Sequence, residues 1–597
     1  MANEVTTPGK VFKFALPVIL FLAGMILLFI RNPDPFLNPI VYAEDGTWTG
    51  IGLTEGWLHA IVNARSDYFV AINILLLLLS TKISSLVTDS PLVFLPQAIA
   101  LTSYGFYSAT ATFAFFTLRR ISPAILSLLG YIFLLLVPLG VTQNEIIGRL
   151  MQVGFYMPLL AVMLLFWRDR LKWQYLKILV DASLLLCAAT NPVVFALVFI
   201  YLLYNISIDW SLELFIKRTI TLIAPFAILM AFLLPRMVGN GDNHGGLVSA
   251  NLIEGVIARP LLYPYVFPWY SSLSDAVSIA LLFLFISFVW FAHKKSTNKE
   301  ARWLILFTAL TLIVCDLATI VNRPGLTGIL SNYQTTFPDR YFMGLNVLVV
   351  LLTMLCLSQL SQKKAYRIYS VVLLLAIFGV YVWHSPLIFE STASRLPLKT
   401  QLDFSEQICL SELSTKVEGE SSIQIYPLLP RWKMIVPGQY INKDGCEFTS
   451  YFDAGIARVG DEYKMQPSVP LSASTPIGIL TSSDHQHKNA GLERIGVLFG
   501  TYGKQNPGEV ELRLKASDGS EFVQRFTLPD LADNKYRYFD LDSKSYTTGE
   551  IVSISGGGVS TWESHNERGH ATCILYEYAG GKRRFTPGCL LPEKKQH

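Results

Sequence analysis

Two adjacent carboxylates follow the first hydrophobic segment of the chain, in the sequence Ala43-Glu44-Asp45-Gly46. Neighbouring like charges resist joint ionisation, so such a pair is costly in a loop that needs only solubility. The pair suits a reaction in which a carboxylate removes a proton from a hydroxyl group. A structural alternative stays open, because acidic residues are also favoured in the first turn of a helix, here one that includes Trp48 to Trp57.

Three arginines near the ends of later hydrophobic segments could stabilise a phosphate group as it leaves, namely Arg149, Arg323 and Arg340. A planar guanidinium group can hold phosphate oxygens through two parallel hydrogen bonds. Two of the three also have a structural interpretation. Arg149 can pair with Glu145, four residues earlier on one helix face, and Arg340 can anchor a helix end at the membrane surface beside Tyr341.

Membrane-spanning helices must position these side chains. The chain of 597 residues is 52% apolar and only 15% charged, and its apolar residues gather in blocks of about 17 to 25, the length that a helix needs to cross a bilayer. Isolated strands could not satisfy their backbone groups in lipid, so the blocks predict helices. The eleven predicted spans are 11–30, 91–118, 123–141, 151–167, 175–190, 193–206, 217–235, 271–293, 303–321, 341–360 and 366–384.

Basic residues predict the orientation of the spans. They form clusters at Lys10/Lys13, Arg119/Arg120, Arg168/Arg170/Lys172, Lys217/Arg218, Lys294/Lys295/Lys299 and Lys363/Lys364/Arg367. With eleven spans, every cluster lies on one side, which we expect to be the cytoplasm, and the N-terminus lies there too. The apolar segment 68–88 would break this pattern if it spanned. We therefore expect it to be an embedded or interfacial helix of the first outer loop, with a twelfth span as the alternative.

Beyond Pro386 the apolar blocks stop, and short segments separated by turn residues predict β-strands. The sequence therefore predicts a transmembrane domain, 1–390, and a β-rich domain, 391–597, with a jelly roll or sandwich over about 460–597. The tail contains Cys409, Cys446, Cys573 and Cys589. An even set of cysteines fits two disulfides in a compartment outside the cytoplasm, with the pairing left open.

The sequence argues against several classes of function. The net charge is +4 and no dense basic run occurs, so nucleic acid is not an expected partner. The chain has no phosphate-binding loop, no nucleophile elbow and no His-Glu-x-x-His helix. Since the outer compartment holds no nucleotide pool, a group transfer there needs a donor that has already crossed the membrane. A sugar linked to polyprenyl phosphate is the simplest such donor.

The acidic pair after the first span, with the many spans of 1–390, resembles the GT-C superfamily of membrane glycosyltransferases. Within that superfamily, the layout is similar to the bacterial serotype-converting glucosyltransferases that act on O-antigen. The resemblance implies that Glu44 or Asp45 is the base, that Arg340 holds the donor phosphate, and that Arg149 or Arg323 assists. It implies a single inverting displacement at the anomeric carbon. No cofactor is expected, and no metal ion, because two carboxylates alone make a poor cage.

Further candidate substrate contacts are Glu145, Tyr341 and His244, the last of which is otherwise part of a turn. In the tail, Phe499–Gly508 and Leu531–Asn534 resemble the turns of galactose-binding-like jelly rolls. Trp562, Tyr502 and Tyr536 could then stack on a sugar ring, or they could belong to the core.

The expected function is transfer of a hexose, glucose in the resembled family, from undecaprenyl phosphate to a periplasmic glycan such as O-antigen. The expected location is a bacterial inner membrane with the C-terminal domain in the periplasm. The expected partners are membrane lipid, the polyprenyl-phosphate sugar and a polysaccharide acceptor. The alternatives are a polymerase or a transporter of lipid-linked oligosaccharides, and a membrane scaffold whose tail binds glycan.

Overall fold

The computed structural model describes residues 8–37, 39–88, 90–208, 212–239, 251–323, 326, 330, 332–334, 337–389, 404, 420–425, 432–440, 448–450, 464–472, 475–479, 491–566, 569–579, 583–586 and 589. The chain divides into two compact units. The helical unit comprises Met1–Leu37, Glu55–Val87 and Phe94–Leu396, and the β unit comprises Asn38–Thr54, Thr88–Val93 and Pro397–His597. The division predicted from the sequence, 1–390 and 391–597, had placed the segments 38–54 and 88–93 with the helices.

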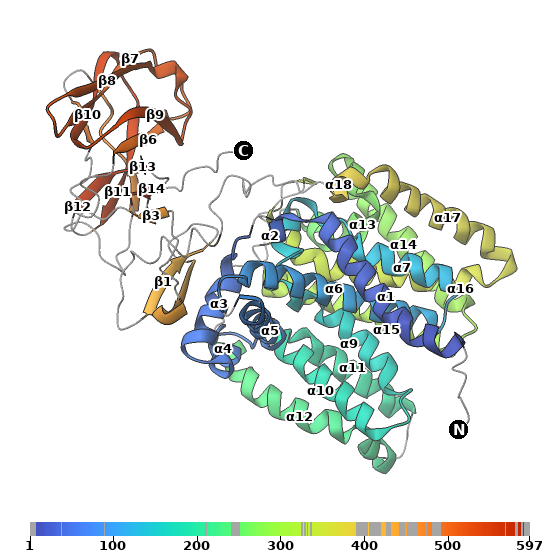
Figure 1. The fold of residues 1–597 in the computed structure, drawn as a ribbon. Helices are drawn as coiled ribbons and strands as arrows, with labels where there is room; N and C mark the ends of the chain where they lie inside the picture. The colour runs from blue at the N-terminus through green and yellow to red at the C-terminus, as the bar shows by residue number, and fades with distance from the viewer. Residues whose placement is uncertain are drawn as a thin grey trace. The chain divides into compact units, whose positions relative to one another are not determined.

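The helical unit is built from helices that run beside one another (Figure 1). The α-helices are α1 (Pro8–Arg31), α2 (Asp34–Leu37), α4 (Trp57–Asn63), α5 (Ala71–Thr88), α6 (Leu95–Arg119), α7 (Ala124–Leu135), α8 (Gln143–Ile146), α9 (Met157–Arg168), α10 (Gln174–Thr190), α11 (Val193–Ile208), α12 (Leu212–Gly239), α13 (Tyr263–Val266), α14 (Asp275–Lys295), α15 (Lys299–Asn322), α16 (Met343–Ser361), α17 (Lys364–Trp383) and α18 (Ser385–Phe389). Between them lie the 3-10 turns η1 (Gly140–Thr142), η2 (Val153–Tyr156), η4 (Phe267–Ser272) and η6 (Phe337–Phe342), and a π-helix, η3 (Glu254–Leu262).

Each of the eleven predicted spans overlaps one of these helices. Within the described residues, six stretches are long and apolar enough to cross a membrane: Ala71–Thr88, Arg218–Arg236, Asp275–Lys295, Lys299–Val321, Asp339–Ser361 and Lys364–Trp383. Four shorter helical stretches are also apolar: Ala15–Arg31, Ala124–Leu135, Val153–Arg168 and Val193–Ile206. The prediction of a polytopic helical membrane protein is confirmed by length and composition, and the number of eleven spans stays a prediction.

The basic clusters gather at one end of the helical unit, which we call the basic end. Glu300, at the start of α15, forms ion pairs with Arg120 after α6 (3.4 Å) and with Arg170 after α9 (3.3 Å). Arg168 donates to the backbone oxygen of Arg218 in α12 (2.9 Å). The Ser296 hydroxyl, just after α14, donates a hydrogen bond to the Gln359 side chain near the end of α16 (3.0 Å), which places these two helix ends together. The predicted grouping is therefore confirmed for these clusters, and the positive-inside rule makes this end the expected cytoplasmic one.

The opposite end, which we call the loop end, is where α1 finishes and α6 begins. The Tyr104 hydroxyl donates to the Asn32 oxygen (2.7 Å), and the Ser108 hydroxyl donates to the Phe21 oxygen (2.6 Å). Because residue numbers rise along α6 as they fall along α1, the two helices are antiparallel. The end of α1, the start of α6 and the segment between α7 and α9 therefore share the loop end.

Helix α5 has the length of a span, yet the structure holds both of its ends at the loop end. The backbone NH of Ile72 donates to Thr190 at the end of α10 (2.9 Å), and Asn73 donates to the Leu150 oxygen (2.7 Å). Near the other end of α5, Ser84 accepts a hydrogen bond from the backbone NH of Phe94, just before α6 (3.1 Å). These contacts support the expectation that 68–88 is an embedded helix of the first outer loop.

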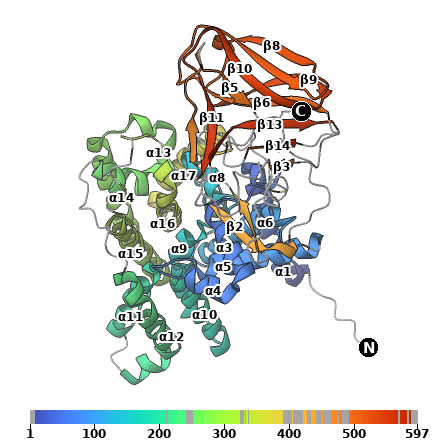
Figure 2. The same ribbon diagram turned by 90° about the vertical axis from the view of Figure 1, so that its left-hand side faces the viewer.

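The β unit contains helix α3 (Ala43–Thr54) and two larger sheets with a separate hairpin (Figure 2). The hairpin pairs β1 (Glu420–Gln424) with β2 (Lys433–Pro437). One sheet has the order β5-β10-β7-β8, and the other has the order β12-β11-β6-β13-β14-β3, with β4 on β11 and β9 on β6. The bounds are β3 (Phe448–Ser450), β4 (Lys464–Pro467), β5 (Ile477–Ile479), β6 (Leu492–Gly500), β7 (Gly508–Ala516), β8 (Glu521–Thr527), β9 (Lys535–Lys544), β10 (Tyr546–Gly556), β11 (Ser560–Asn566), β12 (Gly569–Thr572), β13 (Ile574–Tyr578) and β14 (Arg583–Phe585).

Alternating side chains of the two larger sheets share one hydrophobic core. Leu512 and Ile551 face each other across β7 and β10, and Val497 and Phe539 come from β6 and β9 of the other sheet; all four are buried. The prediction of a β-rich tail is confirmed, and the jelly-roll topology stays a prediction. Cys573 and Cys589 form a disulfide, while Cys409 and Cys446 lie outside the described residues.

Candidate functional site

The acidic pair lies in the first turn of α3, within the β unit. Ala43 begins the helix with a left-handed φ of 41°, and the backbone NH of Asp45 donates to the Tyr42 oxygen (3.0 Å). Glu44 is half-buried and Asp45 is fully buried. The position in the first turn is the one expected from the helix-capping alternative, because helix amides favour negative charge there. A buried carboxylate is costly, however, so the burial of Asp45 exceeds what a solvated cap needs.

Helix α3 approaches the β1–β2 hairpin closely, which fixes the backbone of the acidic pair. The Thr47 hydroxyl donates to the Lys433 oxygen (3.3 Å). A Cβ atom on Gly50 would lie 2.8 Å from the Ile435 oxygen, and one on Gly46 would lie 2.7 Å from a methyl group of Val41. Glycine follows the acidic pair because a side chain would force the helix away from its neighbours.

In the helical unit, the structure brings four of the predicted residues together around the ring of Tyr341. Arg340, in η6, forms an ion pair with Glu145 of α8 and donates to the Tyr341 hydroxyl (3.1 Å). The Arg323 guanidinium, at the end of α15, lies 3.9 Å from the centre of the same ring, and that of Arg340 lies 5.0 Å from it. Two cations therefore lie close to one aromatic ring, where Glu145 is buried and Arg340 nearly so.

Arg149 lies nearby in sequence to Glu145 and is buried. Its backbone oxygen accepts a hydrogen bond from Ser103 in α6 (2.9 Å), and the preceding Gly148 has a φ of 86°. A Cβ on Gly148 would lie 2.5 Å from Pro35, so this turn requires glycine. The turn directs Arg149 into the interior of the loop end.

Sequence reasoning missed a second buried ion pair beside the first. Asp339, the neighbour of Arg340, pairs with Arg259 of the π-helix η3, and both side chains are 1% exposed. The Arg259 guanidinium lies 3.6 Å from the ring centre of Tyr263, and Tyr270 donates to Glu254 (2.9 Å). The only local signal was the juxtaposition of an acid and a base at 339–340. The π-helix that contains Arg259 could not be recognised in the sequence, because the spacing of its apolar residues does not distinguish it from other segments.

Two residues at the end of α1 clamp the segment that carries Glu145 and Arg149. Arg31 donates to Gln143 (3.0 Å) and to the backbone oxygens of Leu135 (2.6 Å) and Val137 (2.7 Å), which end α7. Asn32 donates to the Ile147 oxygen (2.9 Å). Arg31 therefore satisfies the unpaired carbonyls of a helix end while it fixes the 143–147 segment.

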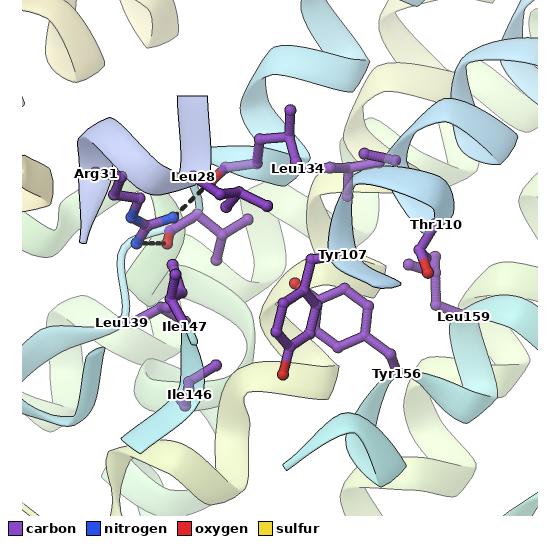
Figure 3. A pocket seen from close by; sticks show the side chains of 13 residues that line it. Leu28, Arg31, Tyr107, Thr110, Leu134, Leu139, Ile146, Ile147, Tyr156 and Leu159 are labelled. Atoms are coloured by element: carbon purple, nitrogen blue, oxygen red, sulfur yellow. Dashed lines mark hydrogen bonds between the residues drawn. The ribbon is translucent and has the colours of Figure 1, made fainter. Parts of the chain in front are cut away.

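A narrow cavity lies under this clamp (Figure 3). Its volume of about 10 Å³ suits a single water molecule. Figure 3 shows Arg31 on one side, the apolar side chains of Ile146 and Ile147 below it, and the rings of Tyr107 and Tyr156 packed together, with centres 4.8 Å apart. The cavity is too small for a sugar, so it belongs to the support of the segment.

The remaining predicted contacts are less informative. His244 lies outside the described residues. In the β unit, Tyr502 is 51% exposed and shares a hydrogen bond with Ser560 (2.9 Å), while Trp562 donates to Asn534 (2.8 Å). Among the residues that the structure describes, no group of three or more His, Cys, Asp or Glu could hold a metal ion.

No family model matches the chain, and no curated protein sequence matches it. Among solved structures, the chain is similar to the cryo-EM structure of arabinosyltransferase EmbB from Mycobacterium smegmatis, with 11% sequence identity and a TM-score of 0.36. That match covers 96% of this chain and 66% of the other, so the chain spans slightly less than two thirds of the length of that protein.

Proposed function

We propose that the protein is a membrane glycosyltransferase of the GT-C type, which takes its sugar from a polyprenyl-phosphate donor. The observation that carries the proposal is the pair of guanidinium groups, from Arg323 and Arg340, that share the ring of Tyr341 at the loop end. Glu145 already offsets the charge of Arg340, and a further anion would stabilise the two neighbouring guanidinium groups. A phosphate at the membrane surface is an anion of the right geometry, because guanidinium forks match its oxygens.

The acidic pair supplies the second part of the chemistry. Glu44 or Asp45 would remove the proton from an acceptor hydroxyl, and the oxygen would form a bond to the anomeric carbon of the donor sugar. The bond between that carbon and the phosphate oxygen breaks in the same step, with inversion. The electron pair goes to the phosphate oxygen, and Arg340 with Arg323 stabilises the charge that develops there.

The finer assignments extend this proposal. The donor would carry a hexose on undecaprenyl phosphate, and the similarity of the layout to the serotype-converting glucosyltransferases makes glucose the proposed hexose. The acceptor would be a periplasmic glycan such as O-antigen, at a bacterial inner membrane with the β unit in the periplasm. The disulfide in the β unit supports an oxidising compartment for that unit. The two carboxylates and the arginines would carry the step without a required metal ion.

The test is transfer by the purified protein in liposomes that contain undecaprenyl-phosphate glucose, with lipopolysaccharide as acceptor. Release of undecaprenyl phosphate should fall by about 10²- to 10⁴-fold in Glu44→Gln or Asp45→Asn, the range for loss of a general base. Glu55→Gln is the matched control, because Glu55 is an exposed acid just beyond α3. Full rates in both acidic-pair variants would end the proposal, as would no release from any hexose donor by the unmodified protein.

A further inference from the structure

A second cavity lies at the basic end of the helical unit, away from the candidate functional site. Its volume is about 450 Å³. The ends of α9 and α11 and the starts of α10, α12 and α15 surround it. The charged lining consists of five basic and two acidic side chains among the described residues: Arg168, Arg170, Lys177, Arg218, Lys299, Asp169 and Glu300.

A buried network makes one wall of this cavity rigid. Arg168 forms two hydrogen bonds with Asp181 (2.5 and 3.0 Å), and both side chains are 3% exposed. Thr221 donates to the same carboxylate (2.6 Å), and the Tyr201 hydroxyl donates to Asp169. The charges of Arg168 and Asp181 compensate each other. Their role is therefore to hold the helix ends in place.

The remaining charges leave an excess of positive potential in the cavity. The Arg170 guanidinium lies 3.6 Å from the centre of the Phe166 ring, and Arg170 shares Glu300 with Arg120. Within the part of the chain that the structure describes, neither Lys177 nor Lys299 forms an ion pair. One carboxylate thus serves two arginines while two lysines face the cavity without an acidic partner. An anionic ligand would relieve this imbalance.

The surroundings of the cavity are those of a lipid headgroup layer. Trp173 and Tyr175, with ring centres 5.9 Å apart, are 64% and 63% exposed, as in the aromatic belts at membrane surfaces. Directly after Lys177 on α10 come Ile178 and Leu179, which are 50% and 63% exposed. Exposed apolar side chains next to a basic cavity provide a path for acyl chains, which a soluble phosphate compound would not need.

We propose that this cavity binds the phosphate headgroup of an anionic phospholipid. Basic pockets between membrane helices on the cytoplasmic side are suited to such headgroups, and each lysine or arginine near the surface strengthens the attraction. Lys177 and Lys299 contact the phosphate, and Arg170 completes the site from α9. The ligand joins the starts of α10 and α15, and it stabilises the basic end. The inference is independent of the proposed transfer reaction.

The test measures lipid binding by the full-length protein in neutral nanodiscs of phosphatidylcholine. Cardiolipin or phosphatidylglycerol is titrated in, and the number of bound lipids is counted by native mass spectrometry. Lys177→Gln with Lys299→Gln should weaken cardiolipin binding by about 30-fold, or about 5-fold for each lysine. The matched control is Lys363→Gln with Lys364→Gln, which removes the same charge at the same end outside the cavity.

Three results would overturn the proposal. One is unchanged affinity in the Lys177/Lys299 variant, and another is an equal loss in the Lys363/Lys364 control, which would indicate general surface attraction. The third is tight binding of glycerol 3-phosphate or inorganic phosphate with no preference for cardiolipin, which would assign the cavity to a soluble ligand. Selective loss in the cavity variant, with cardiolipin favoured over both small anions, supports the lipid site.

Discussion

The two ends of the helical unit differ in how much of their charge is exposed to water. At the loop end, Arg259 with Asp339 and Arg340 with Glu145 are paired and largely removed from water. At the basic end, Arg168 with Asp181 is also buried, but Glu300 is a partly exposed acid between Arg120 and Arg170, and Lys177 and Lys299 line the cavity. A buried pair fixes geometry because breaking it leaves an uncompensated charge, whereas an exposed pair contributes little. The first arrangement suits precise positioning of a reacting group, and the second suits attraction of a mobile anion.

The largest expected effect comes from breaking the buried pair at the loop end. Asp339→Ala would leave Arg259 buried and unpaired, so we expect a loss of about 3–5 kcal/mol in the free energy of unfolding. Glu300→Gln at the basic end should cost less than about 1 kcal/mol, because its pairs are exposed. Thermal unfolding in detergent would measure both.

A double variant sharpens this comparison. Arg259→Met together with Asp339→Leu removes both charges and should recover much of the stability that Asp339→Ala loses, since apolar groups of similar volume can replace a buried pair. Equal losses in the free energy of unfolding for Asp339→Ala and Glu300→Gln would contradict this difference between the two ends.

The next effect concerns the proposed donor site. Arg340→Gln should lower kcat/KM for the lipid-linked donor by about 10- to 100-fold, the worth of a hydrogen bond to a charged group. Arg340→Lys should restore part of the rate, since it keeps the charge and loses the planar fork. Arg367→Gln at the basic end is the control. A similar loss in that variant would remove the distinction between the ends.

A smaller effect is expected from the partner of Arg340. Glu145 competes with phosphate for this guanidinium, so Glu145→Gln should strengthen binding of undecaprenyl phosphate, by about 10-fold. The product is a phosphate monoester with a second ionisation near neutral pH, and the donor is a singly charged diester. Product release should therefore slow, and kcat and KM should fall together. A fall in kcat alone would mean that Glu145 only supports the fold.

The smallest effect tests the pairs that Glu511 forms with two exposed arginines in the β unit. Hydrogen bonds from Arg513 (2.6 Å) and Arg525 (2.9 Å) lower the pKa of the Glu511 carboxyl. Because the pKa is lowered on folding, the pairs stabilise β7 and β8 above the ordinary carboxyl range, and this contribution is lost as the pH falls through the folded pKa. Hydrogen exchange in β7 and β8 between pH 6 and pH 3 (about the span of carboxyl titration) would measure it. Glu511→Gln should remove the pH dependence, and an unchanged profile in that variant would assign it to other groups.

Some features of the fold could be predicted from local patterns. Apolar blocks predicted helices at all eleven expected positions. The separation of α5 from the spans stays a prediction, because its length and composition also suit a membrane crossing. In the tail, alternation predicted strands such as β6 and β7. The even cysteine count predicted disulfides without their pairing, and the structure shows one of them, between Cys573 and Cys589. The candidate arginines were found by type and by their place near span ends.

The sequence alone determined where the chain enters an apolar environment, which end of the helices carries the basic residues, and where strands replace helices. These properties depend on neighbours a few residues away, and a helix or strand period reports them. Only the tertiary structure decided that Arg340 meets Glu145, that Arg259 reaches Asp339 from a π-helix, and that 38–54 packs with the tail. Those partners are chosen by packing between distant segments, because any of several arginines could satisfy a given carboxylate until the backbone fixes which one is near.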